Sequence, residues 1–314
     1  MDYANIFYRG RYVYSTKEYV SAFRSGFFYI SYDPRERKKM LEEIESIIDF
    51  YSSVDLYAFA HLLYDTGDKY ALSRAYSILE MIVSWNYIPA KYLLGQMYYF
   101  GAYVEQDYSK FFALSLEAAN AGFVPAKNAL AIAYFNGQGC AKDWNKGRKL
   151  LEECENAKYG VGYANLGVGY FKGLYGYPKD EYKAFEYFKL ASGQFNVKGT
   201  YNLALMYLSG TGCKKDVEKG LYELMNAASL GHVKAQSKVG DYYYYGEITK
   251  KNLDRAYEFY LMAAENGDPH GMYSVGYMII YNEKPFIDRY TGIDWLRKAA
   301  NLGNESAKEL LKKI

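Results

Sequence analysis

Residues 199–231, GTYNLALMYLSGTGCKKDVEKGLYELMNAASLG, decide the fold of this chain. The segment reads as two short amphipathic helices, with a turn at Gly210 and Gly212 and with Asp216 as the N-cap of the second helix. A lone hairpin of this size cannot bury its apolar face, so it needs similar hairpins on both sides. The segment therefore predicts one member of a stack.

The same pattern recurs along most of the 314 residues, at intervals of 34 to 37. A tyrosine follows each reference residue by eight positions in seven consecutive repeats, and a glycine comes three positions later in six of the repeats. The reference residues are Ser21, Leu56, Ala90, Ala126, Gly162, Gly199, Ala235 and Gly271, with a partial ninth repeat at Ala307. This periodicity predicts an all-α fold, an α/α superhelical solenoid of about eight helix-turn-helix repeats.

We expect four parts along the chain. Residues 1–20 would form an N-terminal arm, residues 21–55 a degenerate capping repeat, residues 56–306 the regular repeats and residues 307–314 a C-terminal capping helix. The loops of the regular repeats end in an Asp or Asn that can accept hydrogen bonds from a helix start, and we interpret these residues as helix caps rather than ligands. They are Asp107, Asp143, Asp180, Asp216 and Asn252.

Composition excludes several classes of protein. The net charge of +2 gives no general case for binding nucleic acid or an anionic membrane. The apolar runs are shorter than the roughly 18 residues that span a bilayer, and the first residues lack the apolar core of a secretory signal. We therefore expect no membrane insertion, a cytoplasmic location and a monomer.

No catalytic, cofactor or metal site is predicted. His61, His232 and His270 fall in different repeats, without the spacing of a metal or catalytic motif. The three cysteines are an odd number with no obvious pairing, which favours free thiols. The sequence therefore does not indicate an enzyme.

The repeat motif can be written small-x3-L-G-x2-Y-x2-G-x-G, followed by D-x2-K-A and A-A-x2-G. It resembles the Sel-one-like repeat family, which is related to the tetratricopeptide repeats. AKYLLGQMYYFG at residues 90–101, GYANLGVGYFKG at 162–173 and AQSKVGDYYYYG at 235–246 match the first-helix motif, and the resemblance covers about residues 21–306. It implies a superhelix used mainly as an interaction scaffold: adaptors in signalling and degradation complexes, bacterial host-interaction factors, and some partners that neutralise toxins. The chain lacks the paired cysteines of the family's secreted, disulfide-rich branch.

Helical geometry predicts a partner-binding stripe on the first helices. We number positions by their offset from the reference residue of each repeat. If offsets 4, 5 and 8 of the first helix are buried, offsets 2, 6, 9 and 10 lie on the opposite side, where the resemblance places the concave face. Lys172 and Asp241 are the only charged residues at these offsets in six repeats, and aromatic residues are frequent, as at the centre of a binding surface. The candidates are Tyr92, Tyr99, Phe100, Phe135, Tyr201, Tyr244, Tyr245, Tyr273, Tyr277 and Tyr281.

These rings have a second interpretation, in which they pack against adjacent repeats rather than bind a partner. Our leading functional hypothesis is a scaffold that binds another protein or a peptide segment. The alternatives are an immunity-type protein that neutralises a bacterial toxin, and glycan binding by aromatic stacking. Nucleic acid is not expected, because single strands require a basic track beside the rings.

Overall fold

The computed structural model describes residues 39, 42, 45, 52–281 and 287–314. The predicted arm at residues 1–20 and nearly all of the predicted capping repeat at 21–55 lie outside the described residues. The chain divides into two compact units, Met1–Tyr159 and Gly160–Ile314. Each unit is described by itself.

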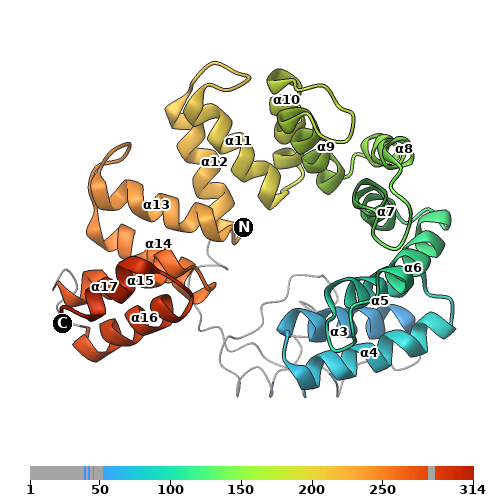
Figure 1. Ribbon diagram of the computed structural model, residues 1–314, viewed down its shortest axis with the longest axis horizontal. Helices are drawn as coiled ribbons and strands as arrows, with labels where there is room; N and C mark the ends of the chain where they lie inside the picture. The colour runs from blue at the N-terminus through green and yellow to red at the C-terminus, as the bar shows by residue number, and fades with distance from the viewer. Residues whose placement is uncertain (1–38, 40–41, 43–44, 46–51, 282–286) are drawn as a thin grey trace. The chain divides into compact units, whose positions relative to one another are not determined.

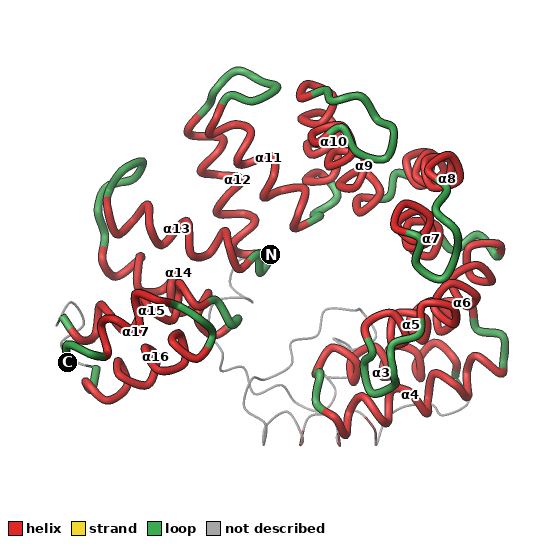
Figure 2. Tube along the Cα trace, viewed as in Figure 1, coloured by secondary structure: helices red, strands yellow, loops and turns green. Residues whose placement is uncertain are grey.

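Every regular element in the described part of the chain is an α-helix, as predicted (Figures 1 and 2). The first unit contains α3 (Ser53–Thr66), α4 (Lys69–Ser84), α5 (Ile88–Phe100), α6 (Tyr108–Asn120), α7 (Val124–Asn136) and α8 (Trp144–Asn156). The second unit contains α9 (Gly160–Lys172), α10 (Glu181–Gly193), α11 (Val197–Ser209), α12 (Val217–Ser229), α13 (Val233–Tyr245), α14 (Leu253–Glu265), α15 (Pro269–Ile280), α16 (Arg289–Asn301) and α17 (Glu305–Leu311). None of these helices combines the length and the apolar composition that crossing a bilayer requires.

Successive helices pack as hairpins, and each hairpin packs on the next. The pairs α5 with α6 and α11 with α12 are two such hairpins, and α10 packs on α11 to join consecutive repeats. The first helices of neighbouring repeats also touch, α3 with α5 in one unit and α9 with α11 in the other. The hairpin stack predicted from the periodicity is therefore present within each unit.

Two helix caps recur at the loop inside the hairpins, a left-handed glycine that ends the first helix and an Asp or Asn that caps the second. Gly210 ends α11 in the left-handed conformation with φ 78°, which glycine adopts without a steric penalty. Asp216 then caps α12 by accepting the Lys219 backbone N–H at 3.0 Å, and its own N–H donates to the carbonyl oxygen of Tyr207 at 2.9 Å. The predicted caps Asp107, Asp143, Asp180 and Asn252 make the same bonds.

The tyrosine that recurs at offset 8 has a structural role in these hairpins. Its ring lies beneath the lysine three residues after the cap, with the Lys219 ammonium 5.8 Å from the ring centre of Tyr207. The same contact joins Lys110 to Tyr98, Lys146 to Tyr134 and Lys183 to Tyr170. A cation above an aromatic face stabilises the pair, so this tyrosine and lysine hold the two helices of a repeat together.

Candidate partner-binding surface

The two tyrosines predicted on α5 are engaged with the next repeat. The ring of Tyr92 packs on Phe123, the N-cap of α7, with ring centres 5.5 Å apart, and burial raises the pKa of its phenol. Tyr99 lies 4.9 Å from the ring of Phe111, and its hydroxyl accepts a hydrogen bond from the Gln138 side chain at 3.1 Å. The Tyr92 ring thus packs between repeats, the second interpretation that the sequence allowed, whereas the Tyr99 ring packs within its own hairpin and only its hydroxyl contacts the next repeat.

Phe135 is not on the surface, and its placement on an exposed stripe is wrong. Only 2% of the residue is exposed, because its ring enters the space left by Gly147 on α8. A Cβ atom at Gly147 would lie 2.3 Å from the ring. Glycine also stands at this position in two other repeats, as Gly220 and Gly292, so the glycine by itself does not reveal from the sequence that the facing ring is buried. Phe100, in contrast, is 63% exposed at the end of α5.

Tyr201 on α11 repeats the arrangement of Tyr92 in the second unit. Its ring stacks on the imidazole of His232 at 4.0 Å, and the Nδ1 atom of His232 accepts the Ala235 N–H to cap α13. Burial and the nearby Lys234 and Lys198 lower the pKa of His232. The half-buried Tyr201 thus covers a helix N-cap of the following repeat.

The remaining candidates gather on α13 and α15, and we call them the C-terminal tyrosine face: Tyr244, Tyr245, Tyr273, Tyr277 and Tyr281. Their rings form short chains, with 5.0 Å between the centres of Tyr244 and Tyr245, 5.9 Å between Tyr273 and Tyr277, and 4.4 Å between Tyr277 and Tyr281. Burial raises the pKa of Tyr273, and the phenols of Tyr277, Tyr245 and Tyr281 add to the rise. The ring contacts thus form two chains, one of Tyr244 and Tyr245 on α13 and one of Tyr273, Tyr277 and Tyr281 along α15.

Exposure within this face is uneven. Tyr245 is 65% exposed and Tyr281 is 53% exposed, whereas Tyr244, Tyr273 and Tyr277 are half-buried beneath them. The Lys251 ammonium lies 5.5 Å from the ring centre of Tyr244. Two of the five rings are thus mostly exposed, and three are half-buried.

A carboxylate at the same repeat stripe, Asp241, links three helices of this region. Its Oδ1 atom accepts the hydroxyl of Tyr260 on α14 at 2.7 Å and contacts Nε2 of His270 on α15 at 2.9 Å. The bond to Asp241 raises the pKa of His270, and burial followed by the same carboxylate raises that of Tyr260. The sequence placed Asp241 on the stripe but did not join it to His270, because the pair is 29 residues apart.

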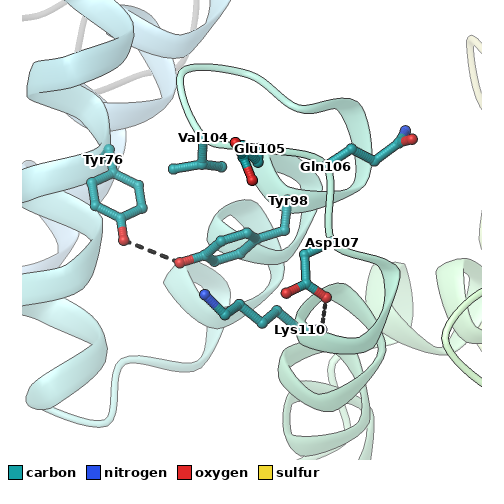
Figure 3. Close-up of a pocket in the computed structure, with 7 residues that line it drawn as sticks. All are labelled: Tyr76, Tyr98, Val104, Glu105, Gln106, Asp107 and Lys110. Carbon is teal, nitrogen blue, oxygen red and sulfur yellow. Dashed lines mark hydrogen bonds between the residues drawn. The ribbon is translucent and has the colours of Figure 1, made fainter.

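A pocket of about 300 Å³ lies outside the predicted stripe, between α4 and the loop that joins α5 to α6 (Figure 3). The hydroxyl oxygens of Tyr76 and Tyr98 are 3.0 Å apart at its wall, and the Lys110 ammonium lies 4.7 Å from the Tyr98 ring centre. The same loop carries Tyr103 at φ 68°, at the repeat position that Gly139 occupies in the fourth repeat. The pocket is lined by none of the predicted partner-binding residues. Tyr175 replaces the same glycine in the fifth repeat, so this tyrosine does not single out the pocket in the sequence.

The described residues offer little for metal or thiol chemistry. No group of three His, Cys, Asp or Glu side chains among them is placed to hold a metal ion. Cys140, Cys154 and Cys213 are free thiols. Burial raises the pKa of Cys154 to about 12, which disfavours the reactive thiolate at neutral pH.

Comparison with known proteins places the chain in a family. The family model described as Sel1 repeat matches six segments, residues 88–123, 124–153, 160–194, 197–232, 233–268 and 269–304. Over 44 residues the chain is 52% identical to "ERAD-associated E3 ubiquitin-protein ligase component HRD3B" of Arabidopsis thaliana, a match that spans 14% of this chain and 7% of that protein.

Solved structures with this fold extend the comparison. A Sel1 repeat protein from Oxalobacter formigenes is 23% identical, with a TM-score of 0.63 over 77% of this chain and 98% of its own. The uropathogenic Escherichia coli protective antigen c5321, described as displaying an SLR fold, is also 23% identical, with a TM-score of 0.58 over 85% of this chain and 57% of its own. Sel1 repeats generally serve as scaffolds that bind other proteins. The matched segments cover most of the described chain, and the protein belongs to the Sel1 repeat family.

Proposed function

We propose that this protein is a binding scaffold that holds a segment of another protein against the C-terminal tyrosine face. The observation that carries the proposal is the pair Tyr245 and Tyr281, which stay more than half exposed above three half-buried tyrosines. Exposed aromatic rings over a packed aromatic base are typical of the centre of an interface, where truncations cost the most binding energy. The face is thus the best candidate for the family's scaffold role.

Tyrosine suits this task physically. Its ring supplies a large contact area with two side-chain torsions to restrict, and its hydroxyl can form a hydrogen bond at the edge of the contact. The half-buried ring of Tyr244 restricts the exposed ring of Tyr245, and that of Tyr277 restricts Tyr281, because these neighbours already occupy the space around them. Less conformational entropy is then lost when a partner binds.

The curated relative supports an adaptor role. By its name it is a component of a ubiquitin ligase, and the match spans 7% of its length. A component of a ligase assembly works in contact with other proteins. We therefore favour a scaffold that brings a partner to an assembly over one that acts by itself.

The experiment begins with selection of random 12-residue peptides displayed on phage, using the purified full chain as the target. The affinity of the tightest peptide is then measured by fluorescence anisotropy for Tyr245→Ala/Tyr281→Ala and for Tyr290→Ala. Tyr290 is the matched control, since it is 75% exposed on α16 and lies outside the face. Two hot-spot truncations at 2 kcal/mol each predict a loss of about 10³-fold in the double variant and almost none in the control.

Three results would contradict the proposal. The double variant could bind as well as the unaltered chain, or Tyr290→Ala could lose as much affinity as the double variant. The third is a selection that enriches no peptide over an unrelated target. Unfolding curves of all variants establish that any lost affinity is not lost structure.

The two narrower predictions from the sequence are separated with the same variants. Glycan binding predicts signals on a glycan array that disappear in Tyr245→Ala/Tyr281→Ala. A toxin-neutralising role predicts a one-to-one complex with the product of a neighbouring gene and loss of that product's toxicity. Neither result is expected of a peptide-binding adaptor.

A further inference from the structure

Asp241 is held in a fixed position on the C-terminal tyrosine face. Tyr260 reaches it from α14 because its ring lies over Gly240, where a Cβ atom would be 2.6 Å from the ring. His270 reaches it from the first turn of α15. The carboxylate is therefore fixed by α13, α14 and α15 together, and it needs little reorganisation to bind a ligand.

The two bonds to Asp241 leave part of the carboxylate unused. Both end on Oδ1, and within the described part of the chain no recorded hydrogen bond or ion pair reaches Oδ2. The side chain is 34% exposed. Because an ionised carboxylate accepts up to about four hydrogen bonds, Asp241 retains capacity for a donor that arrives from solvent.

We propose that Asp241 and the ring of Tyr245, which lies one helical turn further along α13, bind a cationic side chain, arginine or lysine, of the partner segment. This inference rests on the proposed function and names the chemistry of the partner. Asp241 would accept N–H donors through Oδ2, and the Tyr245 ring would attract the cation through its face. Rings in this region already attract ammonium groups, since Lys251 lies over Tyr244 and Lys238 over Tyr242. An acidic segment would meet the carboxylate and be repelled.

His270 makes this site sensitive to pH. The groups that face its imidazole are Asp241 on α13, Tyr260 on α14 and Asp268 at its own helix N-cap. Protonation places a positive charge 2.9 Å from Oδ1 and offsets the charge of Asp241. A cationic side chain should therefore bind more weakly as the pH falls through the pKa of His270, which Asp241 raises above its ordinary value.

The test uses the peptide selected against the full chain. We expect that peptide to contain an arginine or lysine, and we expect Asp241→Asn to weaken it by about tenfold, the loss typical of one charge-assisted hydrogen bond. Asparagine still accepts the Tyr260 hydroxyl, so the fold is retained. Asp294→Asn is the matched control, because it removes an exposed carboxylate from α16 of the same unit.

The same contact can be removed from the peptide while the protein stays unchanged. Citrulline in place of the arginine, or norleucine in place of the lysine, should cost about as much as Asp241→Asn, and the two changes together should cost little more than either alone. His270→Gln should abolish the weakening of binding at acidic pH.

Three outcomes would overturn the inference. They are selected peptides without a cationic residue, an affinity that Asp241→Asn leaves unchanged, and losses from peptide and protein that simply multiply. If Tyr245→Ala/Tyr281→Ala still abolishes binding in those cases, the scaffold proposal survives and only the cation site fails. If no peptide is selected, both fail.

Discussion

Aromatic rings stand at equivalent repeat positions on the first helices of the two units, α5 and α7 in one and α13 and α15 in the other. The surroundings of these rings nevertheless differ. Tyr92 meets an aromatic N-cap, Phe123, on the next first helix. Tyr273 occupies the same offset, but the next N-cap is Asn304, whose amide donates to the Pro269 carbonyl instead. The offset places a ring on the stripe, and the residue that faces it decides whether the ring is used in packing.

The residues of the second helix also decide whether a ring on the first helix is buried. Phe135 is drawn inward because α8 offers Gly147. Tyr244, at the same offset on α13, packs beside Tyr245 and stays half-buried. Tyr92 and Phe135 thus stabilise the stack, whereas the C-terminal tyrosine face keeps two rings exposed.

The largest effect expected from this difference is on stability. Phe135→Ala should lower the free energy of unfolding by about 3 to 5 kcal/mol, because it removes a buried ring and leaves a cavity. Phe100→Ala, which removes the same group from an exposed site, should change it by less than about 0.5 kcal/mol. Urea unfolding followed by circular dichroism measures both, and equal effects would show that Phe135 is not buried.

A smaller effect is expected from the glycine that admits this ring. Gly147→Ala should destabilise the protein by roughly 1 to 3 kcal/mol through overpacking against Phe135, even though alanine favours helix by about 1 kcal/mol. Gly193→Ala is the control, since a Cβ atom there meets no atom within 4 Å. We expect the control to leave stability unchanged or raise it slightly, and a stabilising Gly147→Ala would contradict the packing described.

The smallest effect is a pH dependence that has opposite signs at two histidines. The pKa of His270 is raised by Asp241, so its contribution to stability is present below its unfolded pKa and is lost as pH rises through the folded pKa. The pKa of His232 is lowered by burial, so its contribution is present at higher pH and is lost as pH falls through the folded pKa.

Two-dimensional NMR titration of the imidazole protons separates these residues from His61, whose pKa Asp65 raises. For the half-exposed His270 the stabilisation should stay below about 1 kcal/mol, because solvent screens exposed ion pairs. His270→Gln should remove the acidic-side stabilisation. A His270 that titrates below His232 would contradict the bond to Asp241.

The sequence predicts the architecture well because every repeat carries the same motif. The tyrosine at offset 8, the loop glycines and the capping acids recur in phase, and their contacts lie within one hairpin or between neighbours. Phe135 could not be placed by period alone, since its burial depends on Gly147 in the facing helix. The link from Asp241 to Tyr260 and His270 requires three helices at their folded distances, which no pattern along the chain supplies.

The most direct test of the account locates the partner without any substitution. Hydroxyl-radical footprinting with mass spectrometry compares the oxidation of individual side chains in the free chain and in its complex with the selected peptide. We predict strong protection of Tyr245 and Tyr281 in the complex and unchanged oxidation of Phe100 and Tyr290, which are also exposed. Protection of Phe100 with continued oxidation of Tyr245 and Tyr281 would contradict the assignment of the binding surface to α13 and α15.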